Sequence, residues 1–351
     1  MAIDLDTLNT TFADLRGPLI NAFETSIPMW RELQKKARVS NDGGTYIERD
    51  FAAGAPAKGT GVYSGDELLT NVRRKQIKKL QVETHRAVAM VTIPKKVLNI
   101  NKGKAAVIRL IDAYPKATME GISGDMNKFM LTGTSRGLVF DTSELLGFVC
   151  LPGTHTSGIG TGVTNGVLSL NENPADQVLP TFNVAKSESG YHFNQRGDVS
   201  SFGASGMKEL RAQYRKAAHY AGKPNSGPDL VVMDSASFAN FEAERESKVR
   251  LELIDGRTEG KTNFLSLTLG MAEVYDDPDL DVSLFSGDAL GGVTYMLNTD
   301  FWEWIWLEKP NISPFADRIG DQDVVSAKFA MQGNAICTKL PAQAVVTGTA
   351  S

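Results

Sequence analysis

Residues 45–51, TYIERDF, begin the segment around which the rest of the chain is expected to fold, and this segment extends to residue 131. Ile47 and Phe51 alternate with Glu48 and Asp50, and this two-residue period predicts a strand. Residues 52–65 are rich in Gly, Ala and Pro, which predicts a loop tip. Two more strands, rich in β-branched residues, are expected at 75–82 and 86–93. A lone hairpin is marginal in water, so we expect a neighbouring subunit to cover the apolar residues of this ribbon.

Residues 104–131 predict one long helix. Its apolar residues recur at steps of three, four or eight and share one face: Ile108, Ile111, Met119, Ile122, Met126 and Phe129. Pro115 removes a backbone donor within this helix, which costs about 3 kcal/mol in an ordinary helix interior. We therefore expect either a bend near residues 114–116 or two helices in line.

The remaining pattern predicts an α+β protein in which helices and strands are segregated. Helices are expected at 4–38 with a break at Pro28, at 204–221 and at 237–249. Gly222 with Pro224 is expected to end the second of these helices, and Asp234 or Ser235 to cap the third. Strands are expected at 145–151, 230–233, 264–271, 272–276, 290–300, 301–307 and in a closing pair, 324–331 with 334–340.

Charge is distributed unevenly along the chain. The whole sequence has a net charge of −4, from 37 basic and 41 acidic residues. Residues 70–104 hold ten Lys or Arg and a single acid, Glu83, so this segment carries +9 and the remainder carries −13. A basic arm on an acidic body indicates either self-association or an anionic partner.

No catalytic, metal or membrane signature emerges from the sequence. The four histidines lack ligand spacing, no nucleophile elbow occurs, and the glycines of 158–162 complete no phosphate-binding motif. Cys150 and Cys337 stand far apart, which favours synthesis in a reducing compartment. Neither a signal peptide nor a run of roughly 20 apolar residues is found. We therefore expect no enzyme activity, no cofactor, no metal and no membrane association.

Two local patterns admit a functional and a structural interpretation. The aromatics of FWEWIW at 301–306 alternate, which favours a strand half-buried against a helix over a ligand-binding platform. Asp277, Asp279 and Asp281 mimic the start of a calcium loop. Val282 and Asp288 replace the Gly and Glu that this loop requires, so an exposed acidic turn is favoured.

The order of these parts resembles the major capsid proteins of tailed bacteriophages, whose fold is named after phage Hong Kong 97. GTGVYSG at 59–65 looks like the tip of that family's extended loop, and NKGKAAVIRL at 101–110 looks like the entry to its spine helix. GDVSSFGASGMKELR at 197–211, GPDLVVMD at 227–234 and YMLNTD at 295–300 resemble one group of these coats. The resemblance extends over nearly the whole chain and depends on order and spacing.

The resemblance implies a Hong Kong 97-type fold in five parts. Residues 1–40 would be an N-terminal arm and 41–102 an extended β-ribbon loop. Residues 103–135 and 311–351 would form a peripheral domain with the spine helix. A Gly/Ser/Thr-rich insertion would occupy 136–199, and an axial domain would occupy 200–310.

The same resemblance implies a major capsid protein that assembles into hexamers and pentamers. These would form the icosahedral head around double-stranded DNA, without sequence-specific DNA binding. Assembly in the host bacterial cytoplasm and residence in the virion follow, as do a separate scaffolding protein, a portal and, as an open option, a decoration protein. The intersubunit contacts expected on the ribbon are Arg73, Arg74, Lys75, Lys78, Lys79, Lys58 and Tyr63.

Three alternative functions stay open at this point: an encapsulin-like compartment, a nucleic-acid-binding protein, and an enzyme with an unrecognised site, which the absent motifs disfavour. An encapsulin-like compartment would share the fold and package an enzyme. A nucleic-acid-binding protein would use the basic 70–104 segment, although that segment lacks the interleaved aromatics that stack bases. Some family members join a loop Lys covalently to a neighbour's Asn. Here Lys58 with Asn311 or Asn334 would be the pair, and non-covalent contact is favoured.

Overall fold

The computed structural model separates the chain into two compact units. The first comprises the described parts of Met1–Ile47, Glu83–Cys150 and Trp302–Ile336, and the second those of Glu48–Val82, Leu151–Phe301 and Cys337–Ser351. The structure describes residues 28–35, 37–39, 44–52, 77–100, 104–133, 148–152, 166–168, 170, 193–222, 227–246, 268–280, 292–317 and 323–350.

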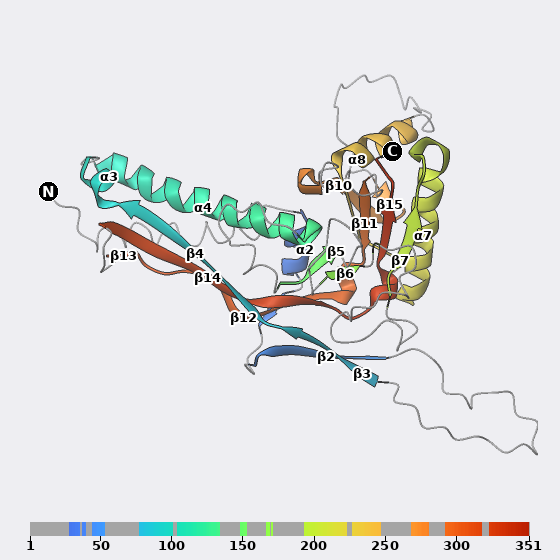
Figure 1. The fold of residues 1–351 in the computed structure, drawn as a ribbon, viewed down its shortest axis with the longest axis horizontal. Helices are drawn as coiled ribbons and strands as arrows, with labels where there is room; N and C mark the ends of the chain where they lie inside the picture. Colours follow the sequence, from blue (N-terminus) through green and yellow to red (C-terminus); the bar gives the residue numbers. More distant parts are fainter. Residues whose placement is uncertain are drawn as a thin grey trace, which may run out of the picture. The chain divides into compact units, whose positions relative to one another are not determined.

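A five-stranded sheet and a long helix make up the first unit (Figure 1). β14 (Val324–Cys337) lies at its centre and pairs antiparallel with β4 (His85–Pro94), from Val324 opposite Pro94 to Gly333 opposite His85. β12 (Trp302–Ile312), β1 (Arg38–Val39) and β13 (Ala316–Asp317) complete the sheet. The short helix α2 (Pro28–Lys35) packs against β12 and buries Met29 and Leu33. The strand predicted at 86–93 is therefore part of a sheet.

α4 (Lys104–Thr132) follows the short helix α3 (Lys95–Ile100) and is one continuous helix of 29 residues with Pro115 inside it. The expectation of two helices in line is wrong. The face with Met119, Ile122, Met126 and Phe129 is buried, and α4 packs along β4, so tertiary burial offsets the hydrogen bond that Pro115 cannot donate. The helix ends at Gly133, whose φ of 71° places it in the left-handed region.

The predicted closing pair of strands at 324–331 and 334–340 is wrong, because β14 runs unbroken through Gly333. A Cβ at Gly333 would lie 2.3 Å from the carbonyl oxygen of Ile305. Glycine is thus needed for the close approach of the β12 backbone and makes no turn. Of the strand predicted at 145–151, residues 145–147 lie outside the described residues; β5 spans Cys150–Pro152 and pairs with β6 (Gly166–Leu168).

A six-stranded sheet with two helices makes up most of the second unit. Its strand order is β7 (Gln195–Asp198), β15 (Ala344–Thr347), β11 (Val293–Leu297), β8 (Leu230–Met233), β10 (Ala272–Asp276) and β9 (Thr268–Leu269). α7 (Met207–Ala221) lies along β7 and β15 (Figure 1), and α8 (Ser235–Glu246) contacts β10. Leu210, Ala217 and Phe241 from the helices share one core with Val231 and Val346 from the sheet.

Helix ends in the second unit follow the predicted signals. Gly222, with φ of 85°, ends α7, and the carboxylate of Asp234 accepts a hydrogen bond from the Ser237 amide at 3.1 Å at the start of α8. A π-helical turn, η2 (Phe202–Gly206), precedes α7. The described residues also contain three short 3-10 turns: η3 (Pro278–Leu280), η4 (Thr299–Phe301) and η5 (Leu340–Ala342).

The last strand belongs to the sheet of the second unit. β15 pairs antiparallel with β11 and parallel with β7. Residues 311–351 are therefore divided between the two units, whereas the sequence-based division kept them with the long helix. The assignment of peripheral and axial domains stays a prediction.

Candidate functional site

The predicted contact ribbon is described at its base. β2 (Tyr46–Ala52) and β3 (Ile77–Glu83) form a two-stranded sheet, as the alternation of 45–51 predicted. The Thr84 amide donates to the Thr45 carbonyl at 2.9 Å, where β3 gives way to β4. The expected tip at 52–65, together with Lys58, Tyr63, Arg73, Arg74 and Lys75, lies outside the described residues except for Ala52. Lys78 belongs to β3, but its side chain is also outside them.

Lys79 is the predicted contact residue whose side chain the structure describes. Its ammonium lies 2.9 Å from Glu48 across the ribbon, and the amide of Gln81 donates to the same carboxylate at 2.6 Å. The hydrogen bond from Lys79 lowers the pKa of Glu48, and the same bond raises the pKa of Lys79. Both side chains are exposed, so this pair lies on the outer face of the ribbon.

The two faces of the ribbon differ in burial. Ile47, Leu80 and Val82 are buried within the single chain. On the other face Tyr46 is 58% exposed and Ile77 is 61% exposed. We expected a neighbouring subunit to cover the apolar residues of the ribbon. This expectation is wrong for the three buried residues and stays a prediction for Tyr46 and Ile77. Tyr46, Ile77, Glu48 and Lys79 form what we call the outer ribbon face.

Part of the charge in the basic segment is matched within the chain. Arg86 lies 2.9 Å from Glu308, and Lys95 lies 3.4 Å from Asp323. These acids follow the basic segment by more than 200 residues, so no local pattern indicates them. On the same sheet Arg38 lies 3.0 Å from Glu303. The first unit thus neutralises several of its own exposed cations.

The aromatic strand is structural. Trp302, Trp304 and Trp306 of β12 are buried, Trp304 stacks on Phe148 at 6.4 Å between ring centroids, and α2 packs against the strand. This confirms a strand packed against a helix and contradicts an exposed ligand platform. In the acidic turn, Asp277 is buried and its carboxylate accepts from the Asp279 amide at 2.9 Å. Asp277 therefore caps a turn, and only its neighbours are exposed.

Asn334 is unsuited to the cross-link considered from the sequence. Its side chain is buried, its amide donates to the Glu83 carbonyl at 2.8 Å, and its oxygen accepts from the Val149 amide at 2.9 Å. Asn311 is exposed on β12.

Neither cysteine thiol is suited to act as a nucleophile or a metal ligand. Burial raises the pKa of the Cys337 thiol to about 12 and raises the pKa of Cys150 as well. Among the described residues, no cluster of three His, Cys, Asp or Glu could hold a metal ion. Nor does any described helix combine the length and apolarity that crossing a membrane requires.

Sequence reasoning missed one surface in the second unit. Lys208, Arg211 and Arg215 are exposed on α7 and border an open pocket of about 480 Å³ beside the η2 turn. Their spacing of three and four residues on a predicted helix was the available signal. We call these three residues the α7 stripe.

Comparison with known proteins establishes the fold. A chain of the cyanophage A-1(L) capsid asymmetric unit superposes with a TM-score of 0.61 at 14% identity, covering 92% of this chain and 93% of that one. The resemblance to tailed-phage major capsid proteins, and the mixed α+β class, are therefore confirmed at the level of fold. At this identity the likeness shows the fold alone.

Two further solved structures have lower TM-scores and add no argument. The capsid of Myoviridae phage XM1 gives 0.48 at 13% identity, covering 90% of both chains. A virus-like particle from Pyrococcus furiosus gives 0.43 at 8% identity, covering 97% of both chains. No family model and no curated protein sequence matches the chain.

Proposed function

We propose that this chain is a major capsid protein of a tailed phage with the Hong Kong 97-type fold. It self-assembles into hexamers and pentamers that form an icosahedral head around double-stranded DNA. The observation that carries the proposal is the shared fold with a phage capsid chain over 92% of this chain. In this proposal α4 is the spine helix of a peripheral domain, and the six-stranded sheet with α7 and α8 belongs to the axial domain.

The outer ribbon face supports a role in contacts between subunits. It presents two large apolar side chains, Tyr46 and Ile77, beside the ion pair of Glu48 and Lys79. Aromatic residues are enriched at the cores of protein interfaces, where apolar area is buried. The ribbon residues Lys58, Tyr63, Arg73, Arg74, Lys75 and Lys78 complete the proposed contact surface.

A structural role also fits the chemistry of the interior. Both thiols are buried with raised pKa values, so neither is exposed as a thiolate nucleophile. The capsid resides in the virion and is assembled in the host cytoplasm with a separate scaffolding protein and a portal. A decoration protein is an open option. DNA is enclosed without sequence-specific binding, because the whole chain is acidic.

The test is assembly of the purified protein. Sedimentation and electron microscopy, with and without a co-expressed scaffolding protein, should show closed shells with pentameric and hexameric units. A protein that stays monomeric across a range of salt concentrations contradicts the proposal. If shells purified from cells enclose an enzyme and no DNA, they would support an encapsulin-like compartment. Tight, sequence-specific duplex binding by isolated subunits would support the nucleic-acid alternative.

A further inference from the structure

The outward side of α7 is basic along its whole length. Leu210 and Ala217 point into the core of the second unit, and the helical period therefore fixes which side of α7 faces away from the sheet. The residues on that outward side are Lys208, Arg211, Ala212, Arg215, Lys216 and His219, and all of them except Ala212 are exposed. We call the α7 stripe together with Lys216 and His219 the basic face of α7.

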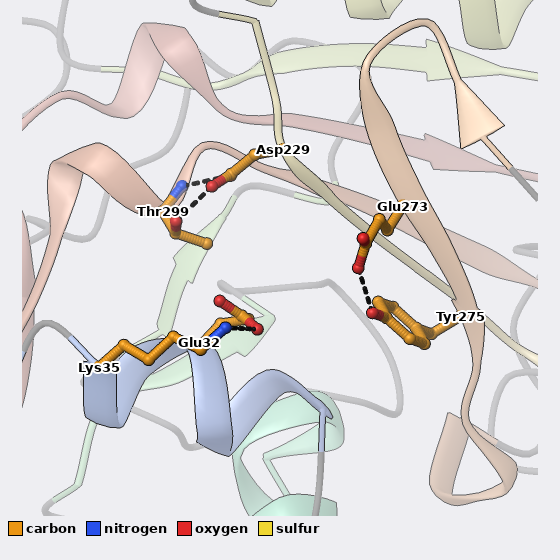
Figure 2. Close-up of polar contacts among 6 residues, drawn as sticks. All are labelled: Glu32, Lys35, Asp229, Glu273, Tyr275 and Thr299. Carbon is orange, nitrogen blue, oxygen red and sulfur yellow. Dashed lines mark hydrogen bonds and ion pairs between the residues drawn. The ribbon is translucent and has the colours of Figure 1, made fainter. Parts of the chain in front are cut away.

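Folding leaves the cations of this face without partners. On α2, by contrast, the ammonium of Lys35 lies 2.6 Å from the carboxylate of Glu32 one turn earlier (Figure 2). On α7 the residues three or four positions from Arg211 are Lys208 and Arg215, and like charges at this spacing destabilise a helix. The four Lys and Arg side chains of the face form no ion pair or hydrogen bond with another described residue. The fold gains nothing from these charges, which indicates an anionic partner outside the subunit.

Two carboxylates lie close to this face and leave it positive. Glu209, the one acid on α7, lies against Gly197 of β7, where an added Cβ would meet its carboxylate at 2.6 Å, so it is turned toward the sheet. Glu244 of α8 lies by the η2 turn, 3.8 Å from the Cβ position of Gly203, and thus at the N-terminal end of α7. Its one negative charge is opposed by the four Lys and Arg of the face, which therefore stays positive beyond the first turn of the helix.

The composition of the face favours a polyanionic backbone over an acidic protein. Among its outward residues only Ala212 is apolar, whereas the buried core of a protein interface is rich in apolar and aromatic side chains. Binding to a phosphate backbone needs only a row of cations, because released counterions drive it. No Phe, Tyr or Trp lies among the outward residues to stack on unpaired bases, which favours a duplex over a single strand.

The spacing of the cations also suits a duplex. The steps of three and four residues from Lys208 to Arg211, Arg215 and His219 correspond to about 4.5 or 6 Å along the helix axis, and the whole row to about 17 Å. Duplex DNA carries one negative charge per about 1.7 Å of its axis. A row of this length can therefore meet several phosphates at once, and the small side chain of Ala212 between the cations lets the backbone approach.

We propose that the basic face of α7 binds the phosphate backbone of double-stranded nucleic acid without sequence preference. The site excludes the pocket beside η2, where Glu244 would repel phosphate. The inference deepens the proposed function and rests on it for the identity of the ligand, since a head that encloses double-stranded DNA supplies this backbone. It differs from the alternative that used the basic 70–104 segment, in which Arg86 and Lys95 already have carboxylate partners.

The salt dependence of binding tests the inference on subunits before assembly. Fluorescence anisotropy with a labelled duplex of random sequence should show that the logarithm of the affinity falls with the logarithm of the salt concentration, with a slope of about −3.6 for four cations. The affinity should therefore drop about a hundredfold between about 50 and about 200 mM salt. A duplex of different sequence should bind equally well.

A charge-removing variant identifies the residues. Arg211→Gln with Arg215→Gln should make the slope shallower by about 1.8 and lower the affinity at about 50 mM salt at least tenfold. Its thermal unfolding should match the wild type, because both side chains are exposed and have no partner among the described residues. As a control, Lys96→Gln with Lys309→Gln removes the same charge from exposed positions of the first unit and should leave the slope unchanged.

Chemical protection tests the site without a mutation. With added duplex, an amine-acetylating reagent should modify Lys208 and Lys216 more slowly, as read by mass spectrometry, whereas Lys96 and Lys309 should react at an unchanged rate. DNA-filled shells compared with empty shells should show the same difference.

The outcomes separate this inference from the proposed function. If the subunits form no shells but the α7 variant loses the salt slope, the capsid function fails and the binding site stands. If shells form and the variant keeps the wild-type slope and affinity, the inference is wrong and the capsid function stands. An equal loss in the control variant, or a preference for one duplex sequence, would also overturn the inference. So would a variant that binds DNA normally and assembles poorly, because it would assign the face to a contact with another protein subunit.

Discussion

Three cations of the first unit and the three cations of the α7 stripe in the second unit differ in how they are paired. In the first unit Arg86, Lys95 and Arg38 each have a carboxylate within 3.4 Å in the same chain. In the second unit the α7 stripe has no such partner among the described residues. A net charge counted along the sequence therefore overstates how much of the basic 70–104 segment is available to other subunits. Charges that folding leaves unpaired are the better guide to a contact surface.

Within the first unit a buried aromatic residue can be compared with an exposed one, and here the largest effect is expected. Trp304→Ala should lower the free energy of unfolding by about 3–5 kcal/mol, because it removes a fully buried ring that contacts Phe148 and Trp306. Tyr46→Ala, on the exposed outer ribbon face, should change it by less than about 0.5 kcal/mol. Chemical denaturation of unassembled subunits measures both. Equal losses would mean that Tyr46 is part of the folded core.

Two glycines, one from each unit, sharpen the comparison at the backbone. Gly333→Ala should destabilise the first unit by about 1–3 kcal/mol, because its new Cβ would meet the Ile305 carbonyl at 2.3 Å. At Gly203, by contrast, a Cβ finds its nearest neighbour at 3.8 Å, so Gly203→Ala should be nearly neutral for the unfolding free energy. Thermal melting of the two variants compares them. If Gly333→Ala left the melting temperature unchanged, β12 and β14 would be able to separate locally.

The predicted ribbon cations can be compared with a cation that is already paired. Reversing Arg73, Arg74 and Lys78 to Glu should leave the subunit folded and slow shell assembly, and high salt should slow the wild type in the same direction. Each exposed pair contributes only about 0–1 kcal/mol, so the effect comes from summation over many interfaces. Arg86→Glu, which breaks the pair with Glu308, is the control and should affect folding more than assembly. Normal assembly kinetics in the triple variant would refute an electrostatic role for the ribbon.

The smallest effect is expected for pH at the outer ribbon face. Glu48 has a lowered pKa, so its contribution is present above the ordinary Glu pKa and is lost as pH falls through the lowered value. Lys79 has a raised pKa, so its contribution is present below the ordinary Lys pKa and is lost as pH rises through the raised value. In Lys79→Met, NMR titration should show the pKa of Glu48 moving up toward its ordinary value. No movement would mean that the pair is absent in solution.

Local elements with strong periodicity could be predicted from the amino-acid sequence. Two-residue alternation located β2, and β-branched runs located β3 and β4. The apolar stripe located α4. Gly222 marked the end of α7, and Asp234 marked the start of α8. The order of these elements resembles that of tailed-phage capsid proteins, and this resemblance indicated the fold. Each element could be located because it requires only local backbone preferences and one apolar face.

Which surfaces meet could be seen only in the folded chain. It made β14 one strand because the β12 backbone approaches Gly333, and it placed β15 between β7 and β11. It paired Arg86 with Glu308 across 222 residues, and it left the α7 stripe without a partner in the described chain. Such contacts depend on distances between segments remote in sequence, and local periodicity carries no information about those distances.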